Sequence, residues 1–156
     1  MTRKQAEAVD LATDPDFRFF TEIGIIAQLT ERMLAATLPD GVHPSHFGIV
    51  NHLVRTGDGK TPIRIAEAMQ VTKTTMTHSL RVLEERGFIR VGPNPEDARG
   101  KIVHLTKKGR DFREDAVARV AERFGGMFTP EIRAAMARSL DDVVTIRRFL
   151  DANRAT

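Results

Sequence analysis

Residues 61–91 of this 156-residue chain read TPIRIAEAMQVTKTTMTHSLRVLEERGFIRV, and this stretch decides the fold. It contains two short runs with apolar residues at helical spacing, and each run begins at a threonine of the kind that caps helix N-termini, Thr61 and Thr72. The second run ends before a glycine, after which the apolar period shortens from about four to two. The stretch therefore predicts two helices joined by a tight turn and followed by a strand.

The second of these helices should expose a polar face of basic character. If Met76 lies at the centre of its buried face, the 100° step of an α-helix turns Thr74, His78 and Arg81 outward together. No acid interrupts this face before Glu84. Such a face suits the major groove of DNA, where side chains meet base edges and phosphates. The candidate DNA contacts of this helix are Thr72, Lys73, Thr74, Thr75, Thr77, His78 and Arg81.

Two short segments rich in β-branched residues, 88–91 and 101–105, predict a β-hairpin. The intervening residues 92–100 are too many for a two-residue turn, so we expect a long loop, and long loops often carry function. An arginine on a proline-stiffened loop matches the attraction of narrow, A·T-rich minor grooves for guanidinium groups. Arg99 and Lys101 are therefore further candidate DNA contacts.

N-cap residues and prolines predict six helices. The predicted starts are Asp14-Pro15, His43-Pro44, Thr61-Pro62, Thr72, Thr106 and Thr129-Pro130. The first helix, about 16–38, and the last, about 130–152, carry broad apolar stripes. Long amphipathic helices at both ends of a small domain more naturally pack against a second copy than against solvent, so we expect a homodimer. Packing within one chain is the alternative.

The composition describes one globular domain over 1–156 with unevenly distributed charge. Residues 60–110 hold 11 Lys and Arg against five Asp and Glu, a net charge of +6 in a chain whose formal net charge is +3. This excess indicates a module that binds a polyanion. The absence of cysteine excludes disulfides, thiolate metal sites and thiol catalysis. Without a signal-peptide pattern or a long apolar run, we expect a cytoplasmic protein with no membrane partner.

The sequence contains no constellation typical of catalysis. Adjacent carboxylates such as Glu84 and Glu85 diverge by 100° on a helix and cannot flank one bond. Three histidines, His43, His46 and His52, fall within ten residues, but their spacings do not bring all three to one helical face. We therefore expect a protein that is not an enzyme and that binds no cofactor or metal.

Residues 97–101 form an Asp-x-Arg-x-Lys pattern, and residues 105–109 follow it with Leu-Thr-x-x-Gly. With this pattern as its most specific feature, much of the chain resembles the MarR family of bacterial transcriptional regulators. The likeness spans about 16–152 and implies a mainly α fold with a small β-hairpin wing. It places a winged helix-turn-helix over 44–110 between N- and C-terminal dimerisation helices. The segments that carry the resemblance are 65–69, 71–77, 83–89 and 97–109.

The resemblance also implies roles for individual residues. Arg99 would be the wing arginine that enters a minor groove, and Asp97 would orient the basic residues of the wing. An acid beside DNA is unfavourable unless it is paired, so we expect Asp97 to pair with Arg99, Lys101 or Arg90. A small-molecule pocket between the dimerisation helices and the winged region is implied as well, with plain core packing as the alternative for each candidate. The pocket candidates are Phe20, Ile23, His46, Phe47 and Phe112.

These observations predict a sequence-specific regulator that binds double-stranded DNA. In its full form the prediction is a ligand-responsive repressor that acts as a homodimer on a pseudo-palindromic operator. Two alternatives stay open: a metal-sensing regulator of the same fold, and a protein-interaction adaptor that has lost DNA binding. The acid-free face of the second helix and the intact Asp97 and Arg99 argue against the adaptor.

Overall fold

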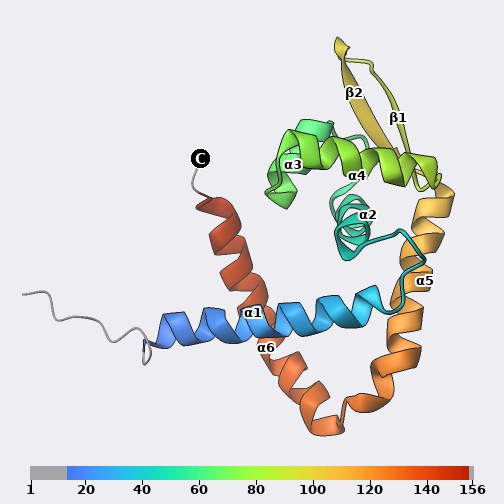
Figure 1. Cartoon of the computed structure of the whole chain (residues 1–156). Coiled ribbons are helices and arrows are strands. Elements are labelled where there is room, and N and C mark those ends of the chain that lie inside the picture. The colour runs from blue at the N-terminus through green and yellow to red at the C-terminus, as the bar shows by residue number, and fades with distance from the viewer. Residues whose placement is uncertain (1–13, 155–156) are drawn as a thin grey trace, which may run out of the picture. The chain divides into compact units, whose positions relative to one another are not determined.

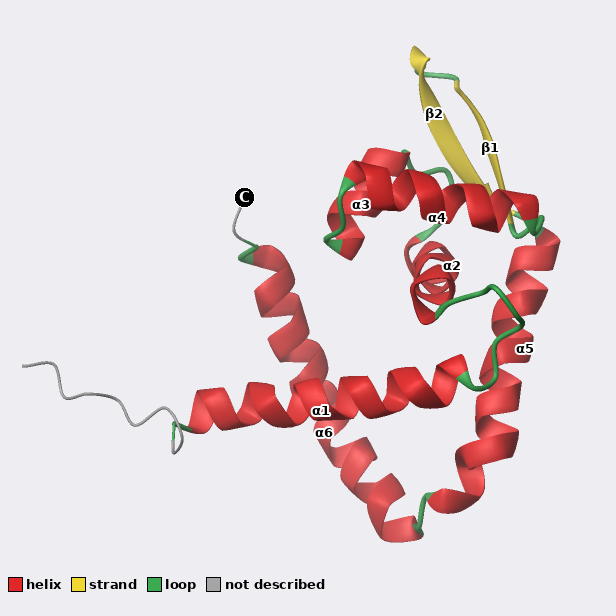
Figure 2. Cartoon of the chain, in the orientation of Figure 1, coloured by secondary structure: helices red, strands yellow, loops and turns green. Residues whose placement is uncertain are grey.

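The computed structural model describes residues 14–154 of the chain (Figure 1). This part is mainly helical and contains one two-stranded antiparallel sheet, which confirms the predicted fold class (Figure 2). The helices are α1 (Pro15–Ala35), α2 (Pro44–Thr56), α3 (Pro62–Met69), α4 (Lys73–Glu85), α5 (Lys107–Phe124) and α6 (Pro130–Ala152). The strands are β1 (Ile89–Asn94) and β2 (Asp97–Leu105), and a 3-10 turn, η1 (Gly125–Met127), precedes α6.

The helices begin where the sequence predicts them because side chains cap their first turns. In α1, α3, α4 and α6 a side-chain oxygen accepts a hydrogen bond from the backbone N–H three residues on. The capping residues are Asp14, Thr61, Thr72 and Thr129. The end of α1 differs from the prediction: the helix stops at Ala35, because the N–H groups of Thr37 and Leu38 bond to carbonyls three residues back and tighten the last turn.

The core joins α2, α3, α4 and the hairpin. The side chains of Leu53, Ile65, Met76, Leu83 and Val103 are almost completely buried, and they come from these four parts of the chain. Full burial of an apolar side chain of this size contributes about 1.5–3 kcal/mol relative to its exposure. Helix α4, which carries the predicted DNA-contacting face, and the hairpin therefore rest on one common core.

The Leu-Thr-x-x-Gly pattern forms the junction between the hairpin and α5. The Thr106 hydroxyl donates to the Gly87 carbonyl at 2.7 Å and accepts the N–H of Gly109 at 3.0 Å. A Cβ at Gly109 would lie 2.1 Å from the Phe88 carbonyl oxygen, so only glycine allows this approach. The Phe88 ring stacks on Phe112 of α5 with centroids 4.3 Å apart. The hairpin base is thus held closely against the start of α5.

The hairpin corrects one prediction, because the expected long loop over 92–100 is wrong. The strands pair in register from Ile89↔Leu105 to Pro93↔Lys101, and the chain reverses at residues 95–96. Pro93 fits into β1 because its ring nitrogen lies on the outer edge of the ribbon, where no ladder hydrogen bond is lost. The register shifts after Pro93, so that residues 98–100 form an irregular tip on β2.

The described residues divide into two compact units between Val117 and Ala118. The first contains α1–α4, the hairpin and most of α5. In the second, the Arg133 guanidinium donates to the Gly125 carbonyl at 2.6 Å and lies 5.7 Å from the Phe128 ring centroid, which fastens η1 to the first turn of α6. The single domain over 1–156 stays a prediction. No helix within residues 14–154 is long and apolar enough to cross a membrane.

Candidate nucleic-acid interface

The helix-turn-helix is formed by α3 and α4, joined by a turn at Gln70. Gln70 adopts the left-handed conformation with φ of 52°, and its N–H bonds to carbonyls of α3. The Thr72 hydroxyl then accepts the Thr75 N–H at 3.1 Å and lies 2.9 Å from the Thr75 hydroxyl. The hydroxyls of Thr72 and Thr75 are therefore engaged in capping α4, which the sequence-based list of DNA contacts did not distinguish.

The two faces of α4 are divided as the helical period predicts. Met76, Leu80 and Leu83 are buried, and Ser79 is buried with them. Thr74, His78 and Arg81 are exposed, as are Lys73 and Thr77. The Thr77 hydroxyl donates to the Lys73 carbonyl at 2.8 Å, which leaves its oxygen as an acceptor toward solvent. The outward direction of this face is confirmed, whereas its contacts to DNA stay a prediction.

Arg81 lies within a small network of polar side chains on the exposed face. Its Nη2 is 3.4 Å from His78 Nδ1, and its Nε is 3.9 Å from Glu85 Oε1. Both members of the Arg81–Glu85 pair are about two-thirds exposed, so the pair contributes little to stability. A phosphate could replace Glu85 as the partner of the guanidinium at small cost.

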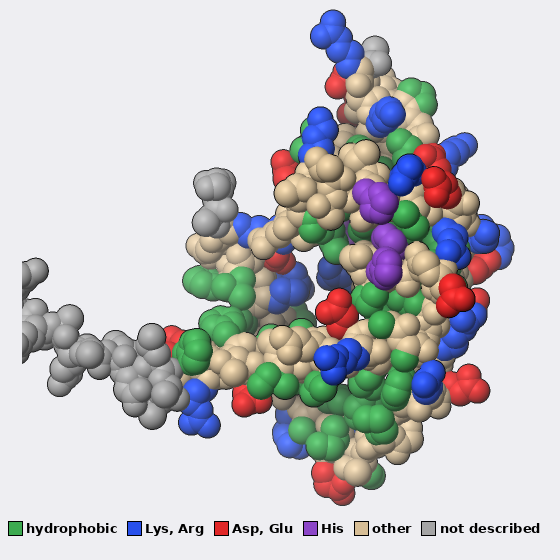
Figure 3. Space-filling model, in the orientation of Figure 1, with side chains coloured by type: hydrophobic (Ala, Val, Ile, Leu, Met, Phe, Trp, Pro, Cys, Tyr) green, Lys and Arg blue, Asp and Glu red, His purple; other side chains and the backbone are tan. Residues whose placement is uncertain are grey.

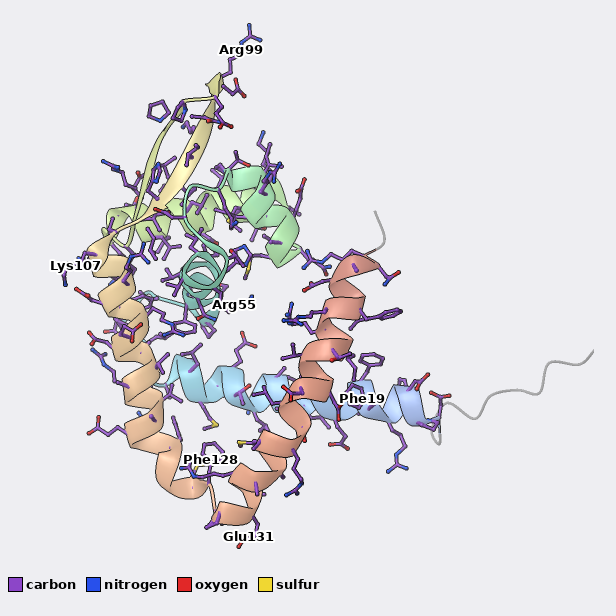
Figure 4. The ribbon with its side chains drawn as sticks, turned by 180° about the vertical axis from the view of Figure 1, so that it is seen from behind. Phe19, Arg55, Arg99, Lys107, Phe128 and Glu131 are labelled. Carbon is purple, nitrogen blue, oxygen red and sulfur yellow. The ribbon has the colours of Figure 1, made fainter. Side chains whose placement is uncertain are left out.

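The wing presents Arg99 at its tip. Figure 4 shows Arg99 at the end of the hairpin, directed away from the helices. The Asp97 carboxylate accepts the Arg99 backbone N–H at 3.0 Å. The expected ion pair between Asp97 and Arg99, Lys101 or Arg90 does not occur in the described part of the chain, so that prediction is wrong. Asp97 orders the backbone of the tip instead, since an Asx turn needs no charged partner.

An open cleft of about 900 Å³ lies between α3, α4 and the hairpin. Five candidate DNA contacts line it: Lys73, Thr77, Arg81, Arg99 and Lys101. Thr72, Thr74, Thr75 and His78 lie outside its lining. The cleft also includes residues that sequence reasoning missed, because their position depends on the packing of the hairpin beside α4. They are Thr61, Pro62, Ile63, Leu80, Glu84, Val91, Gly92, Pro93, Asn94 and Gly100, and the predicted wing-orienting residue Asp97 lines the cleft as well.

A cluster of histidines lies where α2 and α4 meet (Figure 3). His46, which is 4% exposed, accepts the His43 backbone N–H on its Nδ1 at 3.1 Å, and the two rings are 5.4 Å apart. His78, on α4, lies near enough to lower the pKa of His46, whereas His52 lies beside Thr56. Within residues 14–154, no group of three or more His, Cys, Asp or Glu side chains is arranged to hold a metal ion.

The His46 imidazole should make the stability of the protein depend on pH. Burial, followed by the positive charges of His43, His78 and Arg86, lowers the pKa of His46 below its usual 6.5. The unfolded chain therefore binds the proton more readily, and the free energy of unfolding should fall as the pH drops through 6.5 toward the folded-state pKa. One such group contributes a slope of at most ~1.4 kcal/mol per pH unit.

Urea unfolding of the wild type and of His46→Asn measures this dependence on pH. The measurements should run from pH 7.5 to 5.5, roughly one unit on either side of the usual histidine pKa. The asparagine oxygen can accept a hydrogen bond but cannot be protonated in this range, so the variant should show the shallower slope. Equal slopes for the two proteins would contradict the assignment to His46.

The five residues proposed for a ligand pocket occupy different environments. His46 and Phe112 are buried, and Phe47 lies 6.3 Å from Phe112 between ring centroids, so these side chains belong to the core or pack on it. Phe20 on α1 is 48% exposed, and Ile23 is half-buried. For Phe47 and Phe112, core packing accounts for the position, and the ligand pocket stays a prediction.

The chain matches known proteins in its sequence and in its fold. Residues 40–100 match the model of the MarR family. Over 107 residues the chain is 24% identical to the uncharacterized HTH-type transcriptional regulator YkoM of Bacillus subtilis, which covers 66% of this chain and 69% of that one. The match to the family model, over residues 40–100, includes the helix-turn-helix and most of the wing.

Solved structures share the fold. Apo MarR from E. coli has a TM-score of 0.67 at 23% identity, over 79% of this chain and 94% of that chain. A mutant MarR in complex with operator DNA has a TM-score of 0.60 at 22% identity, over 81% and 93%. CouR from Rhodococcus jostii bound to p-coumaroyl-CoA has a TM-score of 0.62 at 22% identity, over 96% and 99%. Residues 40–100 therefore match the MarR family of transcriptional regulators, and the chain has the winged helix-turn-helix fold of the solved MarR structures.

Proposed function

We propose that this regulator is a ligand-responsive repressor that binds a pseudo-palindromic operator as a homodimer. The observation that carries the proposal is the cleft between α3, α4 and the hairpin, which gathers Lys73, Arg81, Arg99 and Lys101 around one concave surface. Two of these cations lie on α4 and two on β2, and a concave surface lined by cations suits the phosphates of a duplex.

Within this surface the residues divide into three roles. Arg81, held only by weak surface contacts, would bind a phosphate and position α4. Thr74 and His78 on the exposed face would meet base edges in the major groove. Arg99, at the tip of the wing, would enter the neighbouring minor groove. Recognition would thus combine direct reading of bases with sensing of groove width.

The proposed homodimer rests on the apolar side chains that α1 and α6 leave exposed. Exposed apolar patches commonly mark protein interfaces. On α6, Leu140 is 59% exposed and Met136 is 50% exposed. The other exposed large apolar side chains of the two helices are Phe17, Phe19, Phe20, Ile25, Ile26, Leu29, Ile132, Val143, Phe149 and Leu150. A second copy of the chain would cover these faces.

The proposed effector is a small molecule. CouR was crystallised with p-coumaroyl-CoA, and its fold is similar over 96% of this chain. By that likeness we propose that a small molecule also regulates this protein. Within residues 14–154, no group of three or more His, Cys, Asp or Glu side chains supports the metal-sensing alternative.

Selection from random duplex DNA tests the proposed function. Duplexes retained by the wild type should share an inverted repeat whose half-site centres lie one helical turn, ~10 bp, apart or a multiple of it. Footprinting on a selected duplex should show symmetric protection. An asymmetric single half-site would contradict the dimer on a palindrome, and no enrichment at low salt would favour the adaptor.

A further inference from the structure

Both outer edges of the hairpin are bonded to the rest of the winged domain. The N–H and C=O of Val103 bond to the Lys60 carbonyl at 2.9 Å and to the Gly59 N–H at 3.2 Å. Val103 therefore directs its backbone groups away from β1. Because this direction alternates along antiparallel strands, Leu105 on β2 and Ile89 and Val91 on β1 must also direct theirs to the outer edges.

A carboxylate from the loop before α3 holds the outer edge of β2. Asp58 Oδ1 accepts the Leu105 N–H at 2.8 Å, and Asp58 Oδ2 lies 3.4 Å from His104 Nδ1. Leu105 is buried, so this carboxylate satisfies a donor at the base of the hairpin, where water has little access. Together with the Lys60–Val103 bridge, this bond fixes β2 to the loop between α2 and α3.

A second carboxylate holds the outer edge of β1, and it comes from α4, the helix that carries the candidate DNA contacts. Glu84 Oε1, in the last turn of α4, accepts the Val91 N–H at 2.8 Å. Val91 and Val103 are register partners, so the two edges are held at nearly the same level of the hairpin. Glu85, the next residue along the helix, pairs with Arg81 instead and forms no hydrogen bond or ion pair with the described residues of the hairpin.

The position of Glu84 is unfavourable for DNA binding unless it has another role. Glu84 lines the same cleft as Lys73, Arg81 and Arg99, where a phosphate would approach, and like charges repel there. A two-stranded hairpin is marginally stable by itself, so its direction depends on such anchors. Arg99 lies about four residues beyond Val103, roughly 13 Å at ~3.3 Å per residue, so a small tilt at the anchors displaces the guanidinium by an ångström or more.

We propose that Glu84 and Asp58 are positioning residues for DNA recognition. They hold the two strands of the hairpin from opposite edges and set the direction in which Arg99 is presented relative to α4. This inference rests on the proposed function of the surface formed by α4 and the hairpin. Neither carboxylate needs to touch DNA.

The first experiment measures the dependence on flanking sequence. The probe is the palindrome selected from random DNA by the wild type, with either A·T-rich or G·C-rich flanks. We expect Glu84→Ala to lose about tenfold in affinity on the A·T-rich flanks, the size of one lost hydrogen bond to a charged group, and to lose less on the G·C-rich flanks. Glu84→Gln keeps an oxygen acceptor for the Val91 N–H, so it should retain the preference for A·T-rich flanks.

A matched control removes the same charge from the same turn without touching the wing. Glu85→Ala should keep the flank preference of the wild type, because the Glu85 carboxylate pairs with Arg81 on α4 and does not hold the hairpin. A double variant, Glu84→Ala with Arg99→Ala, completes the comparison. Arg99→Ala should reduce the affinity for DNA less in the Glu84→Ala background than in the wild type, because a misdirected wing already contributes less to DNA binding.

The second experiment reports on the anchors without DNA. Amide hydrogen exchange should be faster at Val91 in Glu84→Ala and faster at Leu105 in Asp58→Ala, with Glu84→Gln protecting Val91 as in the wild type. The melting temperature of each variant shows that the chain still folds. If Asp58→Ala unfolds, Glu84→Ala alone decides the matter, since Glu84 is exposed and its loss leaves the core intact.

The outcomes separate this inference from the proposed function. If the wild type binds no duplex, the proposed function fails and the inference fails with it. If the wild type prefers A·T-rich flanks and Glu84→Ala keeps that preference, only the inference is overturned. It is also overturned if Glu84→Gln behaves like Glu84→Ala on both flanks, because the hydrogen-bond acceptor would then be irrelevant.

Discussion

Replacing Leu140 and Val143 together with aspartate should convert the proposed homodimer into monomers and abolish operator binding. The two side chains are 59% and 37% exposed on one face of α6. In a twofold dimer the double substitution places four carboxylates in an apolar interface, and each unpaired buried charge costs several kcal/mol. Light scattering measures the mass of the particle, and gel shift on the selected palindrome measures binding.

The control for this prediction adds the same charges to another face of the same helix. At 100° per residue, Ala134 and Thr145 lie roughly opposite Leu140 and Val143, and both are exposed. Ala134→Asp with Thr145→Asp should therefore leave the dimer intact. If the Leu140 and Val143 variant is still a dimer with unchanged thermal stability, the interface lies elsewhere on the chain.

Removing Arg99 should weaken binding mainly on operators with A·T-rich flanks. A guanidinium gains most from the negative potential of a narrow minor groove, and G·C-rich flanks widen that groove. We expect Arg99→Ala to lose roughly 1–3 kcal/mol on A·T-rich flanks and much less on G·C-rich flanks. Fluorescence anisotropy on the selected palindrome with exchanged flanks measures both values.

Arg81→Ala provides the comparison, because Arg81 is proposed to contact a phosphate. Its loss should weaken binding to specific and non-specific duplexes together and reduce the slope of log K against log salt by about one. Equal losses for the two variants on every duplex would mean that the surface acts as a basic patch without distinct roles for its residues.

The sequence predicted those parts of this protein that depend on neighbours within one helical turn. Capping side chains bond to N–H groups three residues on, and the buried face of α4 follows from the spacing of Met76, Leu80 and Leu83. The six helix starts and the outward direction of Thr74, His78 and Arg81 needed no long-range information. The charge excess over 60–110 and the Asp-x-Arg-x-Lys pattern likewise identified the wing as part of the candidate interface.

The length of the strands was predicted less well. Prolines and glycines over 92–100 are typical of loops, yet most of these residues belong to β1 and β2. A proline is excluded from a strand only where its nitrogen would have to donate, and that depends on which edge of the ribbon it faces. The register between the two strands determines which edge the proline faces, and the sequence of one strand alone does not determine that register.

Only the tertiary structure decided which side chains anchor the wing and which histidines meet. The sequence presented Glu84 merely as the first acid of a helix face, whereas the fold brings it to the Val91 N–H and brings Asp58 to Leu105, 47 positions along the chain. The fold also brings His78, on a different helix, near enough to lower the pKa of His46. Helix propensity and capping depend on residues a few positions apart in the sequence. The contacts of Glu84 and Asp58 with the hairpin form only when the core packs α2, α4 and the hairpin together, because packing then decides which acceptor lies nearest to each donor.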